Sequence, residues 1–242
     1  MPRFARVVAA GAPHHVTQRG NNRQRVVHFQ QDYQVFLALL AERARQHECR
    51  ILGYCLMPNH VHLVVIPDHS QALARALGRA HNAYSRYLNG RLSRSGHLWQ
   101  NRFYSAPLSR HHLIDALRYV DLNPLRAKLV ERAVEYRWSS AAAHLAGHDS
   151  SGLLDLSEWS KICPPGEWSG QLAYSNEEER WAERLREATR HGRPWGDESF
   201  VRQISELAGR DLMPGPRGRP RSNGNSATNS ATLVAGAVHA AG

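Results

Sequence analysis

One stretch of this sequence, PNHVHLVVI at residues 58–66, decides how the rest is interpreted. It is an apolar run that carries two histidines, His60 and His62, separated by one residue. If the run is a β-strand, its side chains alternate between faces, so both histidines point the same way and Val61 points into a core. Two imidazoles on one rigid strand can bind a divalent metal ion, although a surface strand that merely contains two histidines has the same pattern.

The segments on either side of this run predict its partners in a sheet. Residues 50–57 are rich in Ile, Leu, Tyr and Cys, which predicts a strand that ends at the break Met57-Pro58-Asn59. Two strands so close in sequence form an antiparallel hairpin, with the histidine pair beside its tight end. Residues 14–19 predict an earlier strand, which is followed by the turn signal Gly20-Asn21-Asn22.

Two amphipathic segments are expected to form helices. Residues 32–48 repeat apolar residues at helical spacing, and a second helix is predicted from about residue 71 to residue 89. One face of this second helix is apolar around Leu77 and Tyr84. Its opposite face carries arginines without interleaved acidic residues, which suits phosphate contact or forms a solvated face.

The order of the predicted elements indicates the fold class. Residues 98–104 predict a further strand, and a helix begins near Ser109 and continues through Val120. Strand, helix, strand, strand, helix, strand, helix is the order that builds an antiparallel sheet with helices on one side. The sequence therefore predicts an α+β fold, a ferredoxin-like sandwich. Near the end of the last helix, Tyr119 and Asn123 are four residues apart and should be neighbours.

The composition points to nucleic acid as a partner. The 242 residues contain 31 Lys and Arg against 21 Asp and Glu, a formal charge of +10. Nearly all of this positive charge is arginine, since Lys128 and Lys161 are the only lysines. Guanidinium groups suit bidentate phosphate contact and stacking on bases. A basic enzyme without a polyanionic ligand would have the same charge.

The cysteines and the hydropathy indicate a compartment. Cys49, Cys55 and Cys163 are odd in number and form no C-x-x-C pair, so we expect neither a disulfide framework nor a zinc site of cysteines. No run reaches the ~20 apolar residues of a membrane span, and the start of the chain has no apolar secretory segment. We expect a cytoplasmic protein associated with the nucleoid.

The composition changes in the second half of the chain. We expect a catalytic domain at residues 1–147 and a linker at 148–176, where Gly, Pro, Ser and Trp occur with little periodicity. A basic helical extension is predicted at 177–221, with helices at 177–191 and 197–209 and an Arg-Gly-Arg-Pro-Arg segment at 217–221. That segment is similar to peptides that lie in the minor groove of DNA, or is a basic tail without sequence preference. Residues 222–242 are predicted to be a disordered tail.

Four motifs occur together in this chain, namely HHVTQRGN at 14–21, PNHVH at 58–62, LWQNRFY at 98–104 and YVDLNP at 119–124. Together they resemble the HUH single-tyrosine transposases, and within these the REP-associated branch, which is tied to repetitive extragenic palindromes. The resemblance covers roughly residues 5–145. Residues 192–221 also resemble the basic extension often appended in that branch. The resemblance implies an HUH-type ferredoxin-like fold and an enzyme that cuts and rejoins single-stranded DNA.

The same resemblance implies the roles of individual residues. Tyr119 matches the nucleophile, and His60 and His62 match the paired metal ligands. The third ligand in related enzymes lies four residues beyond the tyrosine, which is Asn123 here, in place of the glutamine of the better-known insertion-sequence relatives. The resemblance further implies a 5′-phosphotyrosine link and a free 3′-hydroxyl.

These residue types suit that chemistry. A strand that is cut and later rejoined without an energy cofactor needs a covalent intermediate, which a tyrosine attacking phosphorus provides. Free tyrosine titrates near 10, so the phenol needs help to react, and a divalent ion can polarise a phosphate oxygen. Imidazole and oxygen ligands together suit Mg²⁺ or Mn²⁺, and imidazole alone would also accept Zn²⁺. The resemblance favours the first two ions.

The predicted partner is single-stranded or hairpin DNA with palindromic repeats, bound by a monomer or a homodimer. The arginines expected along the DNA path are Arg19, Arg23, Arg75, Arg79, Arg86, Arg102, Arg217, Arg219 and Arg221. Two other functions fit parts of the sequence. One is a metal-dependent nuclease that activates water, and the other is a non-catalytic protein that recognises palindromic repeats.

Overall fold

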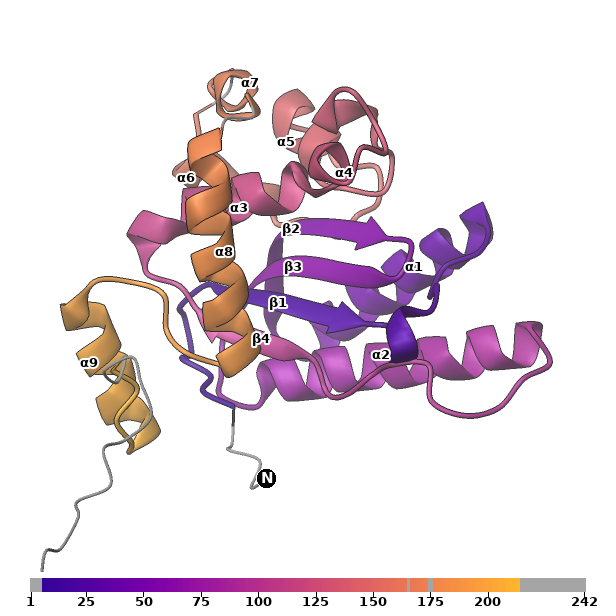
Figure 1. Cartoon of the computed structure of the whole chain (residues 1–242), viewed down its shortest axis with the longest axis horizontal. Coiled ribbons are helices and arrows are strands. Elements are labelled where there is room, and N and C mark those ends of the chain that lie inside the picture. The colour runs from indigo at the N-terminus through magenta and orange to yellow at the C-terminus, as the bar shows by residue number, and fades with distance from the viewer. Residues whose placement is uncertain (1–5, 165, 174–175, 214–242) are drawn as a thin grey trace, which may run out of the picture.

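The computed structural model describes residues 6–164, 166–173 and 176–213. At its centre lies a four-stranded antiparallel sheet with the strand order β2-β3-β1-β4 (Figure 1). The strands are β1 (His14–Arg19), β2 (Cys49–Met57), β3 (His60–Pro67) and β4 (Tyr104–Pro107). Helix α1 (Gln30–Gln46) joins β1 to β2, and α2 (Ala72–Arg91) joins β3 to β4. This βαββαβ arrangement confirms the predicted ferredoxin-like sandwich.

Both faces of the sheet are covered, whereas the sequence predicted helices on one side. Helices α1 and α2 cover one face, and α3 (Leu113–Asp121), α6 (Leu156–Ile162) and α8 (Asn176–His191) cover the other (Figure 1). The reason lies in β2 and β3, whose residues are buried at odd and even positions alike. A strand that is apolar at both parities needs a layer on each face.

The remaining elements lie around this core. Within the described residues, four further helices follow α3, and three 3₁₀ turns connect larger elements. The helices are α4 (Asn123–Arg126), α5 (Ala141–Ala146), α7 (Trp168–Gln171) and α9 (Glu198–Ala208), and the turns are η1 (Asn21–Arg23), η2 (Arg110–His112) and η3 (Ala133–Glu135). Helix α9 packs Val201 and Ile204 against Val7 and Ala9 near the start of the chain.

The last strand lies later than the sequence predicted. We expected a strand at residues 98–104, but β4 begins only at Tyr104. Leu98 and Phe103 are instead buried in the core beneath the sheet, and Trp99 donates from Nε1 to the carbonyl oxygen of His81. The aromatic side chains of this segment therefore serve packing, and only Trp99 forms an isolated bridge to Gly20.

Helix α3 approaches the sheet closely at Gly53. The register of β2 against β3 shifts between Ile51 and Gly53, which marks a β-bulge. A Cβ atom on Gly53 would lie 2.7 Å from Cδ2 of Leu117, a distance that a real side chain could not keep. The absence of a side chain at this position therefore lets α3 rest directly on β2.

The span 148–176, predicted to be a linker, contributes to the core. It contains α6 and α7, and Trp159 and Trp168 are buried in the cluster beneath α3. Trp168 Nε1 donates to the buried carboxylate of Asp121 at 3.0 Å, and Ser140 Oγ and His144 Nδ1 contact the same carboxylate at 2.5 and 2.7 Å. The large side chains explain this packing, since tryptophan buries much apolar area even in a segment without periodicity.

Both predicted helices of the extension are present, as α8 and α9. The Arg-Gly-Arg-Pro-Arg segment and the predicted tail lie outside the described residues. Among the described residues, we find no helix with both the length and the apolar composition needed to span a membrane.

Candidate active site

The histidine pair lies on the sheet face that α3 covers. His60 and His62 are on β3, and their ring centroids are 4.9 Å apart. Val61 points the opposite way, into the core that α1 and α2 form with the sheet. Both imidazoles therefore share one face, as the alternation of a strand requires.

His60 is oriented by its neighbour in sequence. Its Nδ1 lies 2.6 Å from Oδ1 of Asn59, and Nδ2 of Asn59 donates to the carbonyl oxygen of Arg23 at 3.3 Å. An amide oxygen only accepts, so Nδ1 of His60 carries the proton and Nε2 is bare. Burial, with the charge of Arg19, lowers the pKa of His60 to about 4, so the ring is neutral at pH 7, as a metal ligand must be.

His62 is the more deeply buried of the two. Its Nδ1 lies 3.0 Å from Nε2 of His15 on β1, and the two rings stack with centroids 5.2 Å apart. Burial holds the pKa of His62 well below its ordinary value, and the neighbouring His60 and His15 add to this effect. This ring is therefore also neutral at pH 7.

Helix α3 brings Tyr119 to the histidines. Its ring centroid lies 5.3 Å from that of His62 and 5.5 Å from that of His15. The hydroxyl accepts from Nε of Arg186 on α8 at 3.3 Å, and the guanidinium of Arg126 lies 4.1 Å above the ring. The phenol therefore stands between the imidazoles and two positive charges.

Asn123 is the first residue of α4 and lines the same cavity as Tyr119 and the histidines. Its Nδ2 donates to the carbonyl oxygen of Tyr119 at 3.2 Å. This bond uses the donor side of the amide, so Oδ1 remains as an acceptor or metal ligand.

These residues line one cavity of about 770 Å³. Among the described residues, five arginines border it and one acidic residue, Glu179, which pairs with Arg186. The lining arginines are Arg19, Arg23, Arg126, Arg186 and Arg190. Such a cavity suits a polyanion.

The donor set fits a hard divalent cation. Two neutral imidazoles and an amide oxygen reach this cavity, and such mixed ligands bind Mg²⁺ or Mn²⁺. Within the described ranges, no three or more His, Cys, Asp and Glu side chains are grouped to hold a metal ion. Asn123 is a ligand type outside that group, so a site here would depend on it.

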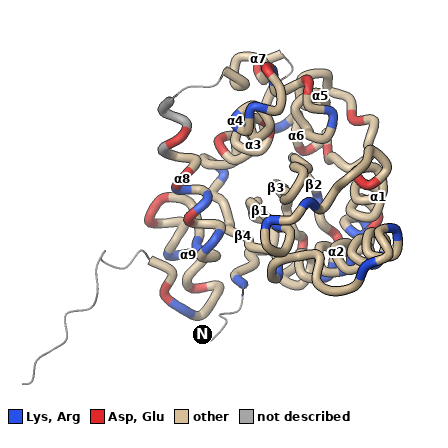
Figure 2. Tube along the Cα trace, turned by 45° about the vertical axis from the view of Figure 1, so that its right-hand side comes forward, with Lys and Arg blue, Asp and Glu red and all other residues tan. Residues whose placement is uncertain are grey.

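The other predicted DNA-binding residues differ in their positions. Arg86 and Arg102 line a second cavity, of about 1220 Å³, between α2 and residues 94–103. Arg75 and Arg79 are exposed on α2 and are not among the residues that line either cavity. Arg217, Arg219 and Arg221 lie outside the described residues. Figure 2 shows basic positions recurring on α2, whereas α8 mixes basic and acidic ones.

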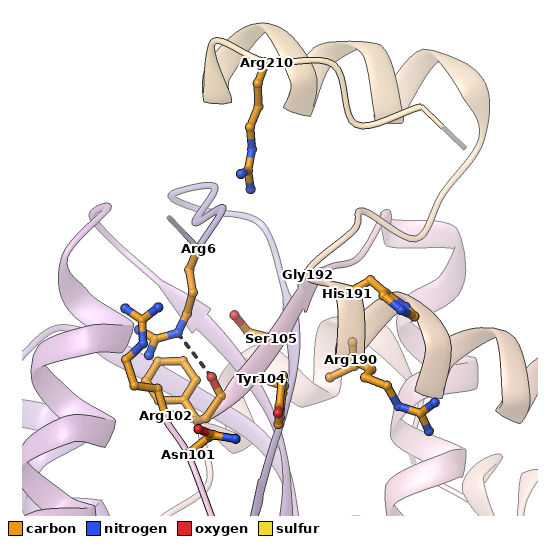
Figure 3. A pocket seen from close by; sticks show the side chains of 11 residues that line it. Arg6, Asn101, Arg102, Tyr104, Ser105, Arg190, His191, Gly192 and Arg210 are labelled. Atoms are coloured by element: carbon orange, nitrogen blue, oxygen red, sulfur yellow. Dashed lines mark hydrogen bonds between the residues drawn. The ribbon is translucent and has the colours of Figure 1, made fainter. Parts of the chain in front are cut away.

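A smaller cavity of about 300 Å³ shares lining residues with both of these cavities. Figure 3 shows arginines around it from the start of the chain, the segment before β4, and the ends of α8 and α9. It shares Arg190 with the site cavity and Arg6 and Arg102 with the second one. Burial and the charge of Arg102 lower the pKa of Arg6 to about 10. Among the described residues, no acidic side chain lines this cavity.

Several residues at the site were not identified from the sequence. His15 belongs to the motif at residues 14–21, but its contact with His62 depends on the pairing of β1 with β3. Arg126 is seven residues beyond Tyr119, a spacing that could have placed it near the tyrosine on a continued helix. Arg186 and Thr189 gave no signal, because they reach the site only through the packing of α8 against the sheet.

This chain is similar to a known protein family and to solved structures. Residues 10–123 match the sequence model of a family described as "Transposase IS200 like". A solved structure of a REP-associated tyrosine transposase bound to a REP hairpin is 19% identical, with a TM-score of 0.47, over 64% of this chain and 90% of that chain. Another, described as a transposase from Deinococcus radiodurans R1, is 17% identical, with a TM-score of 0.35, over 50% and 96%. No curated protein sequence matches the chain.

Proposed function

Because residues 10–123 match the sequence model of the IS200-like transposase family, we propose that this chain cuts and rejoins single-stranded DNA through Tyr119. Residues 1–147 would carry the chemistry. The observation that carries this proposal is the 5.3 Å separation of the rings of Tyr119 and His62, from a helix and a strand far apart in sequence. A phenol and a pair of neutral imidazoles around one basic cavity form a site for phosphoryl transfer.

The proposed step is a transesterification. The hydroxyl oxygen of Tyr119 attacks the scissile phosphorus, the bond from phosphorus to the 3′-oxygen breaks, and that oxygen takes up the proton as a free 3′-hydroxyl. A 5′-phosphotyrosine results, and attack by a DNA hydroxyl reverses the step. A divalent ion held by His60, His62 and Asn123 would polarise a non-bridging oxygen and align the phosphate. Arg126 and Arg186 would offset the charge that develops on the phosphate.

The substrate that fits best is a hairpin of palindromic-repeat DNA with a single-stranded flank. The motif resemblance to the REP-associated branch favours it, and the basic cavities with shared lining residues would offer a path for the flanking strand. The contact of Tyr119 with histidines of its own chain supports a site completed within one protomer.

The test is formation of a covalent adduct. The purified protein is incubated with Mn²⁺ and labelled oligonucleotides from the DNA that flanks its gene, and adducts are separated on a denaturing gel. We expect Tyr119→Phe to abolish both the adduct and cleavage, since the nucleophile is lost. Tyr33→Phe, which removes a hydroxyl in the stack with Trp138, is the matched control and should behave as the unmodified protein.

The two alternatives predict different gels. A nuclease that uses His60 and His62 to activate water would still cleave as Tyr119→Phe and would form no adduct. A protein that only binds palindromic repeats would show salt-dependent binding without cleavage in Mg²⁺ or Mn²⁺. Either result would contradict the proposed transferase.

A further inference from the structure

We propose that Thr189 and His15 are positioning residues that fix the tautomer of His62, so that helix α8 forms part of the metal site. This inference rests on the proposed function, because it assigns a role toward the same cation. Thr189 lies beyond the segment matched by the family and is 174 residues from His15.

The hydroxyl of Thr189 carries a single proton and lies near two polar atoms. Oγ1 lies 2.7 Å from the carbonyl oxygen of Leu185 and 2.7 Å from Nδ1 of His15. The carbonyl oxygen can only accept, so the hydroxyl donates to it. The hydroxyl oxygen must then accept from His15, which places the ring proton of His15 on Nδ1.

His15 passes this constraint on to His62. The ring of His15 is 1% exposed, where a charged imidazolium would be costly, so it carries one proton. With that proton on Nδ1, Nε2 is bare and accepts from Nδ1 of His62 at 3.0 Å. His62 is 6% exposed, where a charged ring would be costly, so with its proton on Nδ1 its own Nε2 is bare and available to a cation.

Each of the three hydrogen-bonded side chains, Thr189, His15 and His62, is shielded from water. His15 and Thr189 are each 1% exposed, and His62 is 6% exposed. Water therefore cannot replace a lost partner easily, and an unsatisfied ring nitrogen would be costly. Without these hydrogen bonds, His62 could carry its proton on Nε2, where the proton would compete with a metal ion.

The two ligands are thus oriented by different means. His60 is oriented by Asn59, its neighbour in sequence. The orientation of His62 depends instead on His15 of strand β1 and, through it, on Thr189 of helix α8. Loss of a group that orients a metal-bound histidine costs typically 10- to 100-fold in metal affinity. A variant at Thr189 should therefore weaken the site without touching any ligand.

The experiment measures Mn²⁺ binding to the full chain by calorimetry, without DNA. Thr189→Val removes the acceptor while keeping the shape, and we expect affinity to fall 10- to 100-fold. Thr189→Ser restores the hydroxyl and should restore binding. The ¹⁵N resonances of the His62 ring in the metal-free protein, assigned with His62→Gln, should show Nε2 bare in the unmodified protein and in Thr189→Ser, and partly protonated in Thr189→Val.

Two outcomes separate this inference from the proposed function. If the unmodified protein binds no Mn²⁺, or binds it equally well as His60→Ala, the proposed metal site is wrong. If it binds Mn²⁺ through His60 and Thr189→Val changes neither affinity nor the ring resonances, this inference is overturned. Should Thr189→Val not fold, His15→Phe keeps the stacked ring, removes the acceptor for His62 and must show the same loss.

Discussion

At the scale of single residues, the site is built from side chains that use one polar atom for orientation and leave the other free. Nδ1 of His60 donates to Oδ1 of Asn59, and the amide NH₂ of Asn123 donates to the carbonyl oxygen of Tyr119. Such hydrogen bonds fix the direction of the other polar atom of each side chain, the one that would bind a metal ion. They do so at little cost in conformational freedom, because the partner is close in sequence.

Asn123 is the residue on which this view is most easily tested. Asn123→Ala removes the amide oxygen, so we expect about a tenfold loss of Mn²⁺ affinity with the fold retained. Asn123→Asp keeps an oxygen in place and adds charge, which should bind Mn²⁺ at least as tightly as asparagine. Calorimetric titration of both variants checks this, and equal affinity for Asn123→Ala and the unmodified protein would remove Asn123 from the ligand set.

At the scale of elements, the site depends on how closely α3 rests on β2. Leu117 of α3 lies over Gly53, and Tyr119 is only two residues further along the same helix. A methyl group at position 53 would push against Leu117, which is fully buried and has little room to change its rotamer, so we expect α3 to shift and to separate the phenol from the imidazoles. Catalytic geometry is sensitive to such shifts, since a misplacement of about 1 Å can cost 100-fold in rate.

Gly53→Ala should therefore reduce both stability and adduct formation. We expect the free energy of unfolding to fall by about 1–3 kcal/mol through overpacking, and the adduct rate to fall by roughly 100-fold. Urea unfolding and the oligonucleotide assay measure the two effects. Gly90→Ala, at an exposed position near the end of α2, meets no atom within 4 Å and should leave both unchanged or raise stability by at most about 1 kcal/mol.

The helices and strands also show which parts of the fold could be predicted from the sequence. The hairpin of β2 and β3 and the helices α1 and α2 follow local periodicity and turn residues, so residues 49–91 lie close to their predicted places. The start of β4 was missed because Leu98 and Phe103 are apolar for packing and not for pairing. The packing of α6 and α7 was missed because Trp159 and Trp168 act through contacts with distant segments.

At the scale of the whole molecule, many buried histidines make the fold sensitive to acid. Burial lowers the pKa of His14 to about 4 and that of His81 to about 3, and both lie outside the proposed ligand set. An exposed histidine in the unfolded chain titrates near 6.5. Between these values the unfolded chain binds more protons than the folded one, so stability must fall as the pH falls from 6.5 toward 4.

We expect each of these two histidines to contribute on the order of 3 kcal/mol to this loss. Urea unfolding at intervals between pH 7 and pH 4 measures it. His81→Phe, in the aromatic surroundings of Phe36 and Trp99, should flatten the pH dependence by the share of one histidine. An unchanged profile in this variant would show that His81 does not resist protonation in the folded state.

The site as a whole was only partly predictable. Tyr119, His60, His62 and Asn123 gather around one cavity as the motifs indicated, because each motif sits on an element whose place follows from the topology. Arg186 and Thr189 come from α8, and no local pattern says which face of a late helix meets which strand. Contacts across 174 residues are set by packing of the complete fold.

The position of α8 has a consequence for protein synthesis. A chain leaves the ribosome from its first residue onward, so the sheet with His60, His62 and Tyr119 can form before residues 176–191 have emerged. Until then, His15 has no hydroxyl to donate to, and Tyr119 lacks the guanidinium of Arg186. A nascent chain that is stalled or cut short before α8 would therefore carry Tyr119, His60 and His62 without the contacts that orient Tyr119 and His62 in the complete fold.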